Sequence, residues 1–276
     1  MESFEGKTAV ITGGGSGIGR GIARVLAKAG ANVVIADINQ EWADETVNEI
    51  AELGGNAIPV RTDVSKLESL QALADAAYER FGAVHILCNN AGVMAWQHAD
   101  EAVHADWEFV INVNLWGVIH GVETFLPRML AQGDECHIVN TASIAGVIPS
   151  GVSALYSTTK FAVVGLSETM SNELAGTNVS VSVLCPGAVT SRLGISTEAN
   201  RPEGSTPRPA TPLDRKGLGS DVSALDADSC GELVRNAIRE KRLHIFTEPT
   251  LRARVQQRLE ATVADFDALS SPEALA

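Results

Sequence analysis

A tyrosine and a lysine stand four residues apart in the segment YSTTK, at Tyr156 and Lys160. On a helix this spacing places both side chains on one face. A phenol titrates near pH 10, too high for a base at neutral pH, and a neighbouring ammonium lowers that pKa by stabilising the phenolate. The pair could therefore accept the proton of an alcohol, although the same spacing also occurs in ordinary surface pairs.

Two further polar residues could join this pair. Ser143 ends the predicted strand 137–143, so its hydroxyl is expected at the carboxyl edge of a sheet, where open α/β folds bind ligands. Asn114 falls within the predicted helix 103–131, where asparagine could equally be an ordinary helix residue. The predicted catalytic residues are Asn114, Ser143, Tyr156 and Lys160.

The segment TGGGSGIG, residues 12–19, lies between a predicted strand and a predicted helix. So tight a turn needs conformations that a Cβ forbids, and the helix that follows presents free N–H groups and its positive dipole end to a phosphate. Asp37 ends the next strand, where a carboxylate can accept both hydroxyls of an adenosine ribose and repel a 2′-phosphate. This favours NAD over NADP. Asp63, followed by Val64, could hold an adenine amino group or cap a helix.

Strand-like and helix-like segments alternate along the chain, which predicts right-handed crossovers and a parallel sheet. Several of the strands are almost continuously apolar, as expected of strands covered on both faces. Strands are predicted over 7–12, 32–37, 57–63, 84–90, 137–143, 180–186 and 242–247. Helices are predicted over 17–29, 40–53, 66–81, 103–131, 153–176 and 226–240. The prediction is one Rossmann-type, doubly wound α/β domain over residues 1–276.

Two regions break this alternation. Residues 191–225 are rich in Gly, Pro, Ser and Thr and are predicted to form a substrate-binding loop or lid, with a disordered insert as the alternative. Its basic residues are expected to be solvated: Arg192, Arg201, Arg208, Arg215 and Lys216. The tail carries an apolar stripe at i+4 spacing, which predicts a helix over 249–269 that docks on this subunit or on a partner. The stripe consists of Leu251, Val255, Leu259 and Val263.

Composition excludes several classes of function. With 45% hydrophobic residues and a formal net charge of −13, the chain can bury a sizeable core but has no basic face for nucleic acid. The four scattered cysteines predict reduced thiols in the cytoplasm. The first residues do not resemble a signal peptide, and no apolar run predicts a membrane span. Neither a metal-ligand spacing among the six histidines nor a GxSxG elbow occurs, so no metal site and no serine hydrolase is predicted.

Taken together, these motifs resemble those of the short-chain dehydrogenases/reductases of the non-extended branch. The resemblance covers about residues 5–190 and rests on Thr12-Gly13-x-x-x-Gly17-x-Gly19, Asn89-Asn90-Ala91-Gly92, Asn114, Ser143, Tyr156-x-x-x-Lys160 and Pro186-Gly187. It implies a seven-stranded parallel sheet flanked by helices, and assembly as a homotetramer or homodimer through the helices near 103–131 and 153–176.

The same resemblance implies a role for each catalytic residue. Tyr156 would be the general base in oxidation and the general acid in reduction. Lys160 would bind the nicotinamide ribose and lower the tyrosine pKa. Ser143 would hydrogen-bond the substrate oxygen, and Asn114 would hold a water that continues a proton relay to Lys160.

The resemblance also places the cofactor and the substrate. Asn90 would shape the sheet beside the adenosine ribose. Pro186 and Gly187, with Val189 and Thr190, would face the nicotinamide carboxamide. The predicted cofactor contacts are Gly13, Ser16, Gly17, Ile18, Gly19, Asp37, Ile38, Asp63, Val64, Asn90, Ala91, Gly92, Tyr156, Lys160, Pro186, Gly187, Val189 and Thr190. The predicted substrate contacts are Met94, Trp96, Ser143, Ala145, Val152 and Tyr156. Trp96 is either an aromatic wall of the pocket or simple packing under the lid.

The hypothesis is an NAD-dependent alcohol dehydrogenase or ketone reductase, without metal, that interconverts a hydrophobic or aromatic secondary alcohol and its ketone, both small molecules. An NADP-dependent carbonyl reductase is one alternative, and Asp37 argues against it. A catalytically idle nucleotide-binding scaffold or sensor is another, and the complete set of catalytic residues argues against that.

Overall fold

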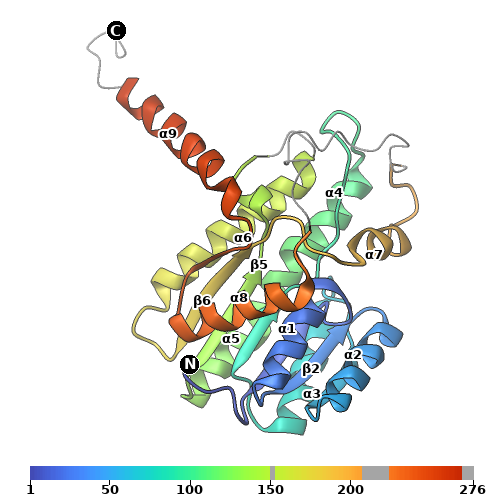
Figure 1. Ribbon diagram of the computed structural model, residues 1–276. Helices are drawn as coiled ribbons and strands as arrows, with labels where there is room; N and C mark the ends of the chain where they lie inside the picture. Colours follow the sequence, from blue (N-terminus) through green and yellow to red (C-terminus); the bar gives the residue numbers. More distant parts are fainter. Residues whose placement is uncertain (150–152, 207–223, 269–276) are drawn as a thin grey trace.

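The computed structural model describes residues 1–149, 153–206 and 224–268. Its centre is a seven-stranded sheet in the order β3-β2-β1-β4-β5-β6-β7 (Figure 1), in which every neighbouring pair is parallel. The strands are β1 Thr8–Thr12, β2 Asn32–Asp37, β3 Asn56–Arg61, β4 Ile86–Asn89, β5 Cys136–Thr141, β6 Val179–Cys185 and β7 His244–Phe246. The predicted doubly wound α/β fold is confirmed, and the strand order reverses between β1 and β4.

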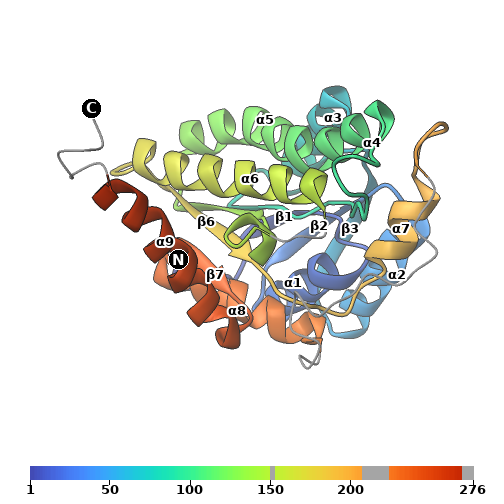
Figure 2. The same ribbon diagram turned by 90° about the horizontal axis from the view of Figure 1, so that it is seen from above.

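Helices cover both faces of the sheet (Figure 2). One face carries α1 Gly17–Lys28, α2 Gln40–Glu52 and α8 Ala227–Glu240, and the other carries α3 Leu67–Phe81, α4 His104–Ile111, α5 Gly117–Gln132 and α6 Ala154–Glu173. Successive residues of a strand point to opposite faces. In β1, for example, Ile11 packs in the core with α1 and α8, whereas Val10 packs in the core with α3 and α5. This explains why the strands are almost continuously apolar.

The predicted helix 103–131 is interrupted. Between α4 and α5 the backbone makes a π-helical turn over Asn112–Trp116, which contains Asn114. Such single turns are rare and occur often at functional sites. By length and composition alone His104–Gln132 could cross a membrane, but this stretch packs on the sheet beside α3 and α6, where 39% of its most apolar window is buried.

Residues 191–206 of the predicted lid are ordered, which contradicts the alternative of a disordered insert for this part. They contain α7 Leu193–Ala199, and Val189 pairs with Leu225 across the base of the lid. The expectation that Arg201 is solvated is wrong. Its side chain is only 13% exposed and its guanidinium lies 3.6 Å from the buried carboxylate of Asp106. Arg208, Arg215 and Lys216 lie outside the described residues.

The C-terminal helix forms as predicted over most of its length, as α9 Arg252–Ala268, but it projects away from the body (Figure 1). Leu251 is buried, whereas Leu259 and Val263 are 53% and 58% exposed. Docking of the whole stripe on this subunit is therefore wrong. Among the described residues, the first half of α9 meets the body, where Arg258 stacks on the Phe161 ring of α6 at 5.0 Å. Residue 269 lies outside the described residues.

A buried histidine makes the fold sensitive to acid. The Nε2 of His137 in β5 lies 2.8 Å from the hydroxyl of Ser182, and that hydroxyl donates to the carbonyl of Arg242. Burial lowers the pKa of His137 to about 3 from its ordinary 6.5. The unfolded chain therefore binds one more proton than the folded protein between those pH values, so this group's contribution to stability is lost as the pH falls through that window.

We predict that His137→Gln flattens the acid dependence of stability. The wild type should lose about 1.4 kcal/mol per pH unit from this group as the pH falls from 6.5. Urea unfolding at pH 6.5, 5.75 and 5 measures the slope, which is independent of any loss of packing in the variant. An identical slope in the two proteins would show that His137 does not carry the effect.

Candidate active site

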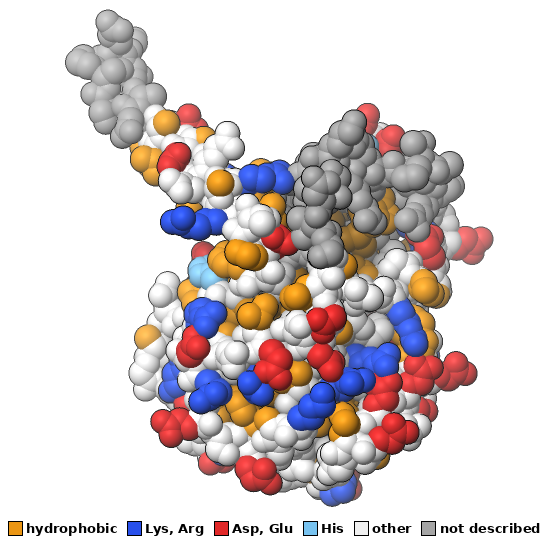
Figure 3. All heavy atoms as spheres, in the orientation of Figure 1, with side chains coloured by type: hydrophobic (Ala, Val, Ile, Leu, Met, Phe, Trp, Pro, Cys, Tyr) orange, Lys and Arg blue, Asp and Glu red, His pale blue; other side chains and the backbone are white. Residues whose placement is uncertain are grey.

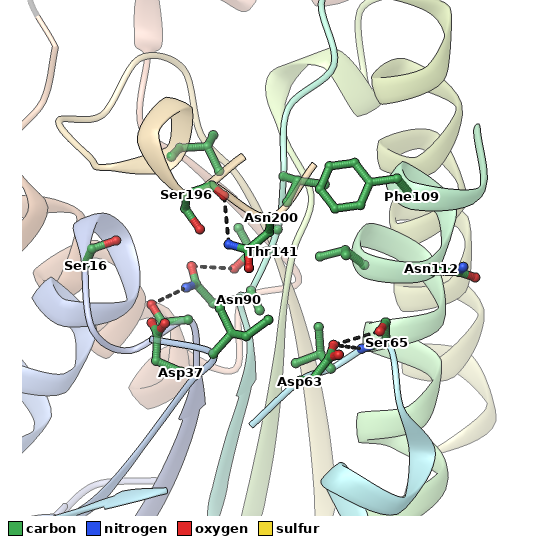
Figure 4. A pocket seen from close by; sticks show the side chains of 18 of the residues that line it. Ser16, Asp37, Asp63, Ser65, Asn90, Phe109, Asn112, Thr141, Ser196 and Asn200 are labelled. Atoms are coloured by element: carbon green, nitrogen blue, oxygen red, sulfur yellow. Dashed lines mark hydrogen bonds between the residues drawn. The ribbon is translucent and has the colours of Figure 1, made fainter. Parts of the chain in front are cut away.

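A cavity of about 700 Å³ opens at the carboxyl edge of the sheet. It spans the reversal of strand order between β1 and β4, where open α/β sheets bind ligands. The wall opposite the strand ends comes from α4, through Phe109, and from the α7 segment, through Ser196 (Figure 4). Of the predicted cofactor residues, the cavity is lined by Gly13, Ser16, Gly17, Ile18, Asp37, Ile38, Asp63, Val64, Asn90, Ala91, Gly92, Tyr156, Lys160 and Pro186.

The glycine loop brings bare backbone to this cavity. Gly13 has a positive φ of 63°, and a Cβ there would lie 2.9 Å from the Cα of Ala91. A Cβ on Gly19 would clash with the carbonyl oxygen of Gly13. Gly17 begins α1 and lines the cavity, so the positive end of that helix faces the space. The loop fits a diphosphate, which needs close backbone approach and N–H donors.

Asp37 is fixed at one end of the cavity. Its carboxylate is 7% exposed and accepts the backbone N–H of Gly15 at 2.9 Å and of Asn39 at 3.0 Å. Burial raises the pKa of this carboxyl above its ordinary value, and the backbone donors oppose that effect. The held carboxylate fits the two hydroxyls of a ribose.

Asp63 stabilises the turn before α3 but does not cap that helix, whose N-cap is Lys66, so the predicted capping role is wrong. Its Oδ1 accepts the N–H of Ser65 at 3.0 Å and the Ser65 hydroxyl at 2.7 Å (Figure 4). Asp63 also lines the cavity, so the adenine-binding role remains a prediction.

The predicted acid–base pair lies on the first turns of α6. Ser153 caps this helix by accepting the N–H of Tyr156, and Lys160 follows one turn later with its Nζ 5.5 Å from the centre of the tyrosine ring. The Nζ donates to the carbonyl of Thr141 at 2.9 Å, and the side chain is 3% exposed. Tyr156 makes a side-chain hydrogen bond to Ser143, so these three residues lie together.

The electrostatics of this pair differ from the expectation. Burial raises the pKa of Tyr156 above its ordinary 10, and the hydrogen bond from Ser143 lowers it less than burial raises it. Burial also lowers the pKa of Lys160 to about 8. The expectation that Lys160 gives the tyrosine a low pKa is wrong for the protein by itself, because removal from water opposes the charged form of both groups.

Asn114 acts on the backbone. Its side chain is fully buried, its Oδ1 accepts the N–H of Val93 at 2.8 Å, and its Nδ2 donates to the carbonyl of Val93 at 2.9 Å. The amide thus holds the segment that follows Gly92. The structure brings Asn114 near Lys160, because a Cβ on Gly92 would lie 3.2 Å from its Oδ1 and 3.7 Å from the lysine Nζ. Its role in a proton relay remains a prediction.

Several other predicted site residues are described by the structure but do not line the cavity. Gly187 and Thr190 are bonded elsewhere: the N–H of Gly187 donates to Thr247 at 2.9 Å, and that of Thr190 donates to the carbonyl of Leu225 at 3.0 Å. Met94 is held to α7 by a hydrogen bond from its N–H to Thr197 at 3.0 Å. Five more predicted residues are absent from the described lining of the cavity: Gly19, Val189, Trp96, Ser143 and Ala145. Val152 lies outside the described residues.

The sequence analysis missed several residues of the cavity. Trp42 on α2 lies beside Asp37 and Gly15, and its only sequence signal is an aromatic residue in the first turn after an acidic strand end. Other missed residues come from α4, the π turn and the α7 segment, among them Phe109, Asn112, Val113, Ser191, Leu193, Ser196, Asn200 and Pro202. Further ones follow β3 or end β5, such as Thr62, Ser65 and Thr141.

Trp42 also belongs to a contact that closes one side of the cavity. The guanidinium of Arg192, just before α7, lies 5.0 Å from the centre of the Trp42 ring and 3.0 Å from the carboxylate of Glu45. Beside it, a Cβ on Gly17 would lie 3.2 Å from the Cα of Ser191. The α7 segment is therefore fastened across the glycine loop.

The fold and the cavity define a dinucleotide-binding α/β protein, and the comparisons identify its family. Residues 7–202 match the model of the short chain dehydrogenases. This chain belongs to the short-chain dehydrogenase/reductase family and is an oxidoreductase of that family.

Three relatives illustrate the range of similarity. A short chain dehydrogenase/reductase from Burkholderia phymatum, solved in complex with NAD, is 40% identical with a TM-score of 0.86 over 99% of this chain and 98% of its own. The 1-deoxy-11-beta-hydroxypentalenate dehydrogenase of Streptomyces avermitilis is 34% identical over 90% of this chain and 87% of its own. The cyclohexanol dehydrogenase of an Acinetobacter species is 38% identical over 67% of this chain and 74% of its own.

We predict that Lys160→Met makes the protein more stable at pH 7. The folded protein binds Lys160's proton with a pKa of about 8 and the unfolded chain with one of 10.5, so the wild type gains stability as the pH rises between these values. Below pH 8 the free energy of unfolding of the variant should exceed that of the wild type by about 3 kcal/mol, reduced by the contribution of the lost hydrogen bond to Thr141. This difference should vanish near pH 10.5. Urea unfolding at pH 7 and pH 10 tests this, and a variant that is less stable at both would contradict it.

We predict that Arg192→Ala speeds dissociation of a bound dinucleotide several-fold, because it releases the α7 segment from Trp42 and Glu45. Stopped-flow fluorescence of NADH release measures the rate. Arg128→Ala is the matched control, since Arg128 lies 5.4 Å from the centre of the Tyr78 ring and 2.7 Å from Asp75, on helices that do not line the cavity as described. Equal release rates in the two variants would show that the contact does not retain the ligand.

Proposed function

We propose that this protein is an NAD-dependent dehydrogenase that interconverts a hydrophobic secondary alcohol and its ketone. The observation that carries the proposal is the grouping of Tyr156, Ser143 and Lys160 beside a cavity whose far end holds the fixed carboxylate of Asp37. One end of the cavity is suited to proton transfer and the other to an adenosine ribose.

Bound NAD would supply the hydride acceptor for an alcohol, and NADH the hydride donor for a ketone. The protein's own task is to manage the proton and to orient the reactants. Ser143 and Tyr156 share a hydrogen bond, so a carbinol oxygen placed between them can donate to the phenolate and accept from the serine. Lys160 faces the tyrosine ring, and we expect its ammonium to favour the phenolate once the positive charge of bound NAD⁺ is added.

The choice of NAD rests on Asp37. Its carboxylate is held by two backbone N–H groups, so it cannot swing away from a 2′-phosphate without breaking them. Like charges at that distance in a partly buried site repel strongly. The NAD complex of the Burkholderia phymatum relative supports the same choice.

The substrate class rests on the apolar part of the cavity. The lining includes the apolar residues Val93, Phe109, Val113, Leu193 and Pro202, which favour a hydrophobic carbon skeleton. The relatives named for cyclohexanol and for 1-deoxy-11-beta-hydroxypentalenate are both named for hydroxylated substrates, which supports an alcohol of this kind.

The first test is a panel of secondary alcohols with NAD⁺, in which formation of NADH is followed by absorbance. We expect turnover of apolar cyclic alcohols, and loss of that turnover by a factor of about 10²–10⁴ in Tyr156→Phe. The variant should bind NADH as the wild type does, because the phenol oxygen contributes to chemistry more than to cofactor binding. Near-wild-type turnover in Tyr156→Phe would overturn the assignment of the base.

The second test is the cofactor preference of Asp37→Ser. Loss of hydrogen bonds to a charged acceptor, worth about 1.5–3 kcal/mol, should weaken NADH binding about 10-fold or more. Removal of the negative charge should strengthen NADPH binding at the same time. Fluorescence titration measures the dissociation constants of NADH and NADPH. A wild type that binds NADPH more tightly than NADH would contradict the proposal.

A further inference from the structure

The outer part of α9 has an apolar stripe that the described remainder of the chain leaves exposed. Exposure rises along the helix from 8% at Leu251 to 53% at Leu259, 58% at Val263 and 68% at Phe266. Figure 3 shows hydrophobic side chains along α9 where it leaves the body. An exposed apolar stripe on a projecting helix is a candidate interaction site.

The stripe continues into a groove on the body. A hollow of about 830 Å³ runs between α9 and the end of β7. Its apolar wall is formed by Ile144, Phe246, Leu251, Val255, Leu259 and Val263. Ile144 directly follows Ser143, so the inner end of the groove lies next to the catalytic strand end. The groove and the stripe form one surface, which we call the α9 face.

The charges of α9 indicate what covers this face. Three arginines, Arg252, Arg254 and Arg258, lie in the first half of the helix, whereas Glu260 and Asp265 lie in the second half. Figure 3 shows the basic side chains near the body and the acidic ones farther out. An isolated helix prefers the opposite arrangement, with acidic residues at its N-terminus and basic residues at its C-terminus. The observed order is unfavourable for α9 alone.

An antiparallel helix of the same sequence removes this conflict. It would place the basic half of each helix beside the acidic half of the other, and the two helix dipoles would oppose each other. A parallel copy would instead bring like charges together. A two-fold axis makes such a contact self-complementary, because the same surface is used on both chains.

We propose that the α9 face is the contact surface for a second copy of this chain, and that the two α9 helices pair antiparallel about a two-fold axis near Leu259. The stripe of each helix packs on the stripe and groove of the other. This contact is separate from the predicted assembly through the helices near 103–131 and 153–176, and it does not rest on the proposed function.

Cysteine cross-linking tests both the pairing and its direction. The four native cysteines are buried and do not compete. Leu259→Cys should form a disulfide-linked dimer under mild oxidation, because the two copies of this residue meet at the axis. Val255→Cys and Val263→Cys should each stay monomeric on a denaturing gel, since each residue would lie about 12 Å from its own copy along the helices, too far for a disulfide.

Mixed together, Val255→Cys and Val263→Cys should cross-link, because each residue faces the other one across the axis. If Val255→Cys formed a disulfide-linked dimer with itself as readily as Leu259→Cys does, the helices would pair in parallel and the proposal would be overturned. Failure of Leu259→Cys to cross-link would also overturn it.

A charge exchange provides an independent test. Arg252→Glu and Asp265→Lys should each weaken the assembly several-fold at low salt, and the double variant should restore it. The two residues lie about 20 Å apart within one helix, so rescue requires contact between two chains. A double variant as weak as the single variants would contradict the antiparallel contact.

The mass in solution, measured by light scattering, tests the role of the stripe. Leu259→Asp should reduce the assembly to half its wild-type mass. The matched control is Leu53→Asp, because Leu53 is 46% exposed and lies at the end of α2. That control should leave the mass unchanged. An unchanged mass in Leu259→Asp, whether the stripe then contacts lipid, another protein or only water, would overturn the proposal.

Discussion

The hydroxyl of Thr12 connects the two strands that border the cavity. It accepts the N–H groups of Asn90 and Ala91, at 2.9 and 3.0 Å, and donates to the carbonyl of Cys88 at 3.3 Å, which uses its full hydrogen-bonding capacity. The side chain of Asn90 returns a bond to the carbonyl of Thr12 at 2.9 Å. These bonds hold the end of β4 against the glycine loop after β1, where the strand order reverses. The position of the cavity depends on this junction.

The polar residues of the site are buried, and burial of polar groups lowers the stability of the fold. Lys160 and Asn114 are almost completely buried, and Asp37 is nearly so. Each is held by backbone groups: Thr141 for the lysine, Val93 for the asparagine, and Gly15 and Asn39 for the aspartate. Buried polar groups are tolerated when they are hydrogen-bonded, and their fixed orientation is what a binding site needs. The lowered pKa of Lys160 and the raised pKa of Tyr156 are consequences of the same burial.

Much of the fold could be predicted from the sequence, because its signals are local. Apolar strands, amphipathic helices and the glycine run after β1 each occupy a short stretch. The end of β2 places Asp37, and the start of α6 places Tyr156, near the same edge of the sheet. Contacts between distant segments left no such signal. Arg192 and Glu45 are 147 residues apart, and nothing near either residue indicates the pairing. The π turn at Asn114 lies inside one continuous apolar pattern that gives no sign of it, and the pKa values depend on burial, which periodicity does not report. The stripe of α9 predicted a helix but not which surface covers it.

The central claim is that Tyr156 exchanges the proton of the substrate. The chain has only two tyrosines, and burial raises the pKa of the other, Tyr78, to about 12. Phenolate absorbance can therefore report on Tyr156 with little interference. The positive charge of an oxidised nicotinamide would add to that of Lys160 in favouring the phenolate. The most direct measurement is a pH titration of phenolate absorbance with and without NAD⁺. The account predicts that NAD⁺ brings one phenol to a pKa well below 10, and that Tyr156→Phe abolishes this step. Titration of both phenols above pH 10 in the presence of saturating NAD⁺ would contradict it.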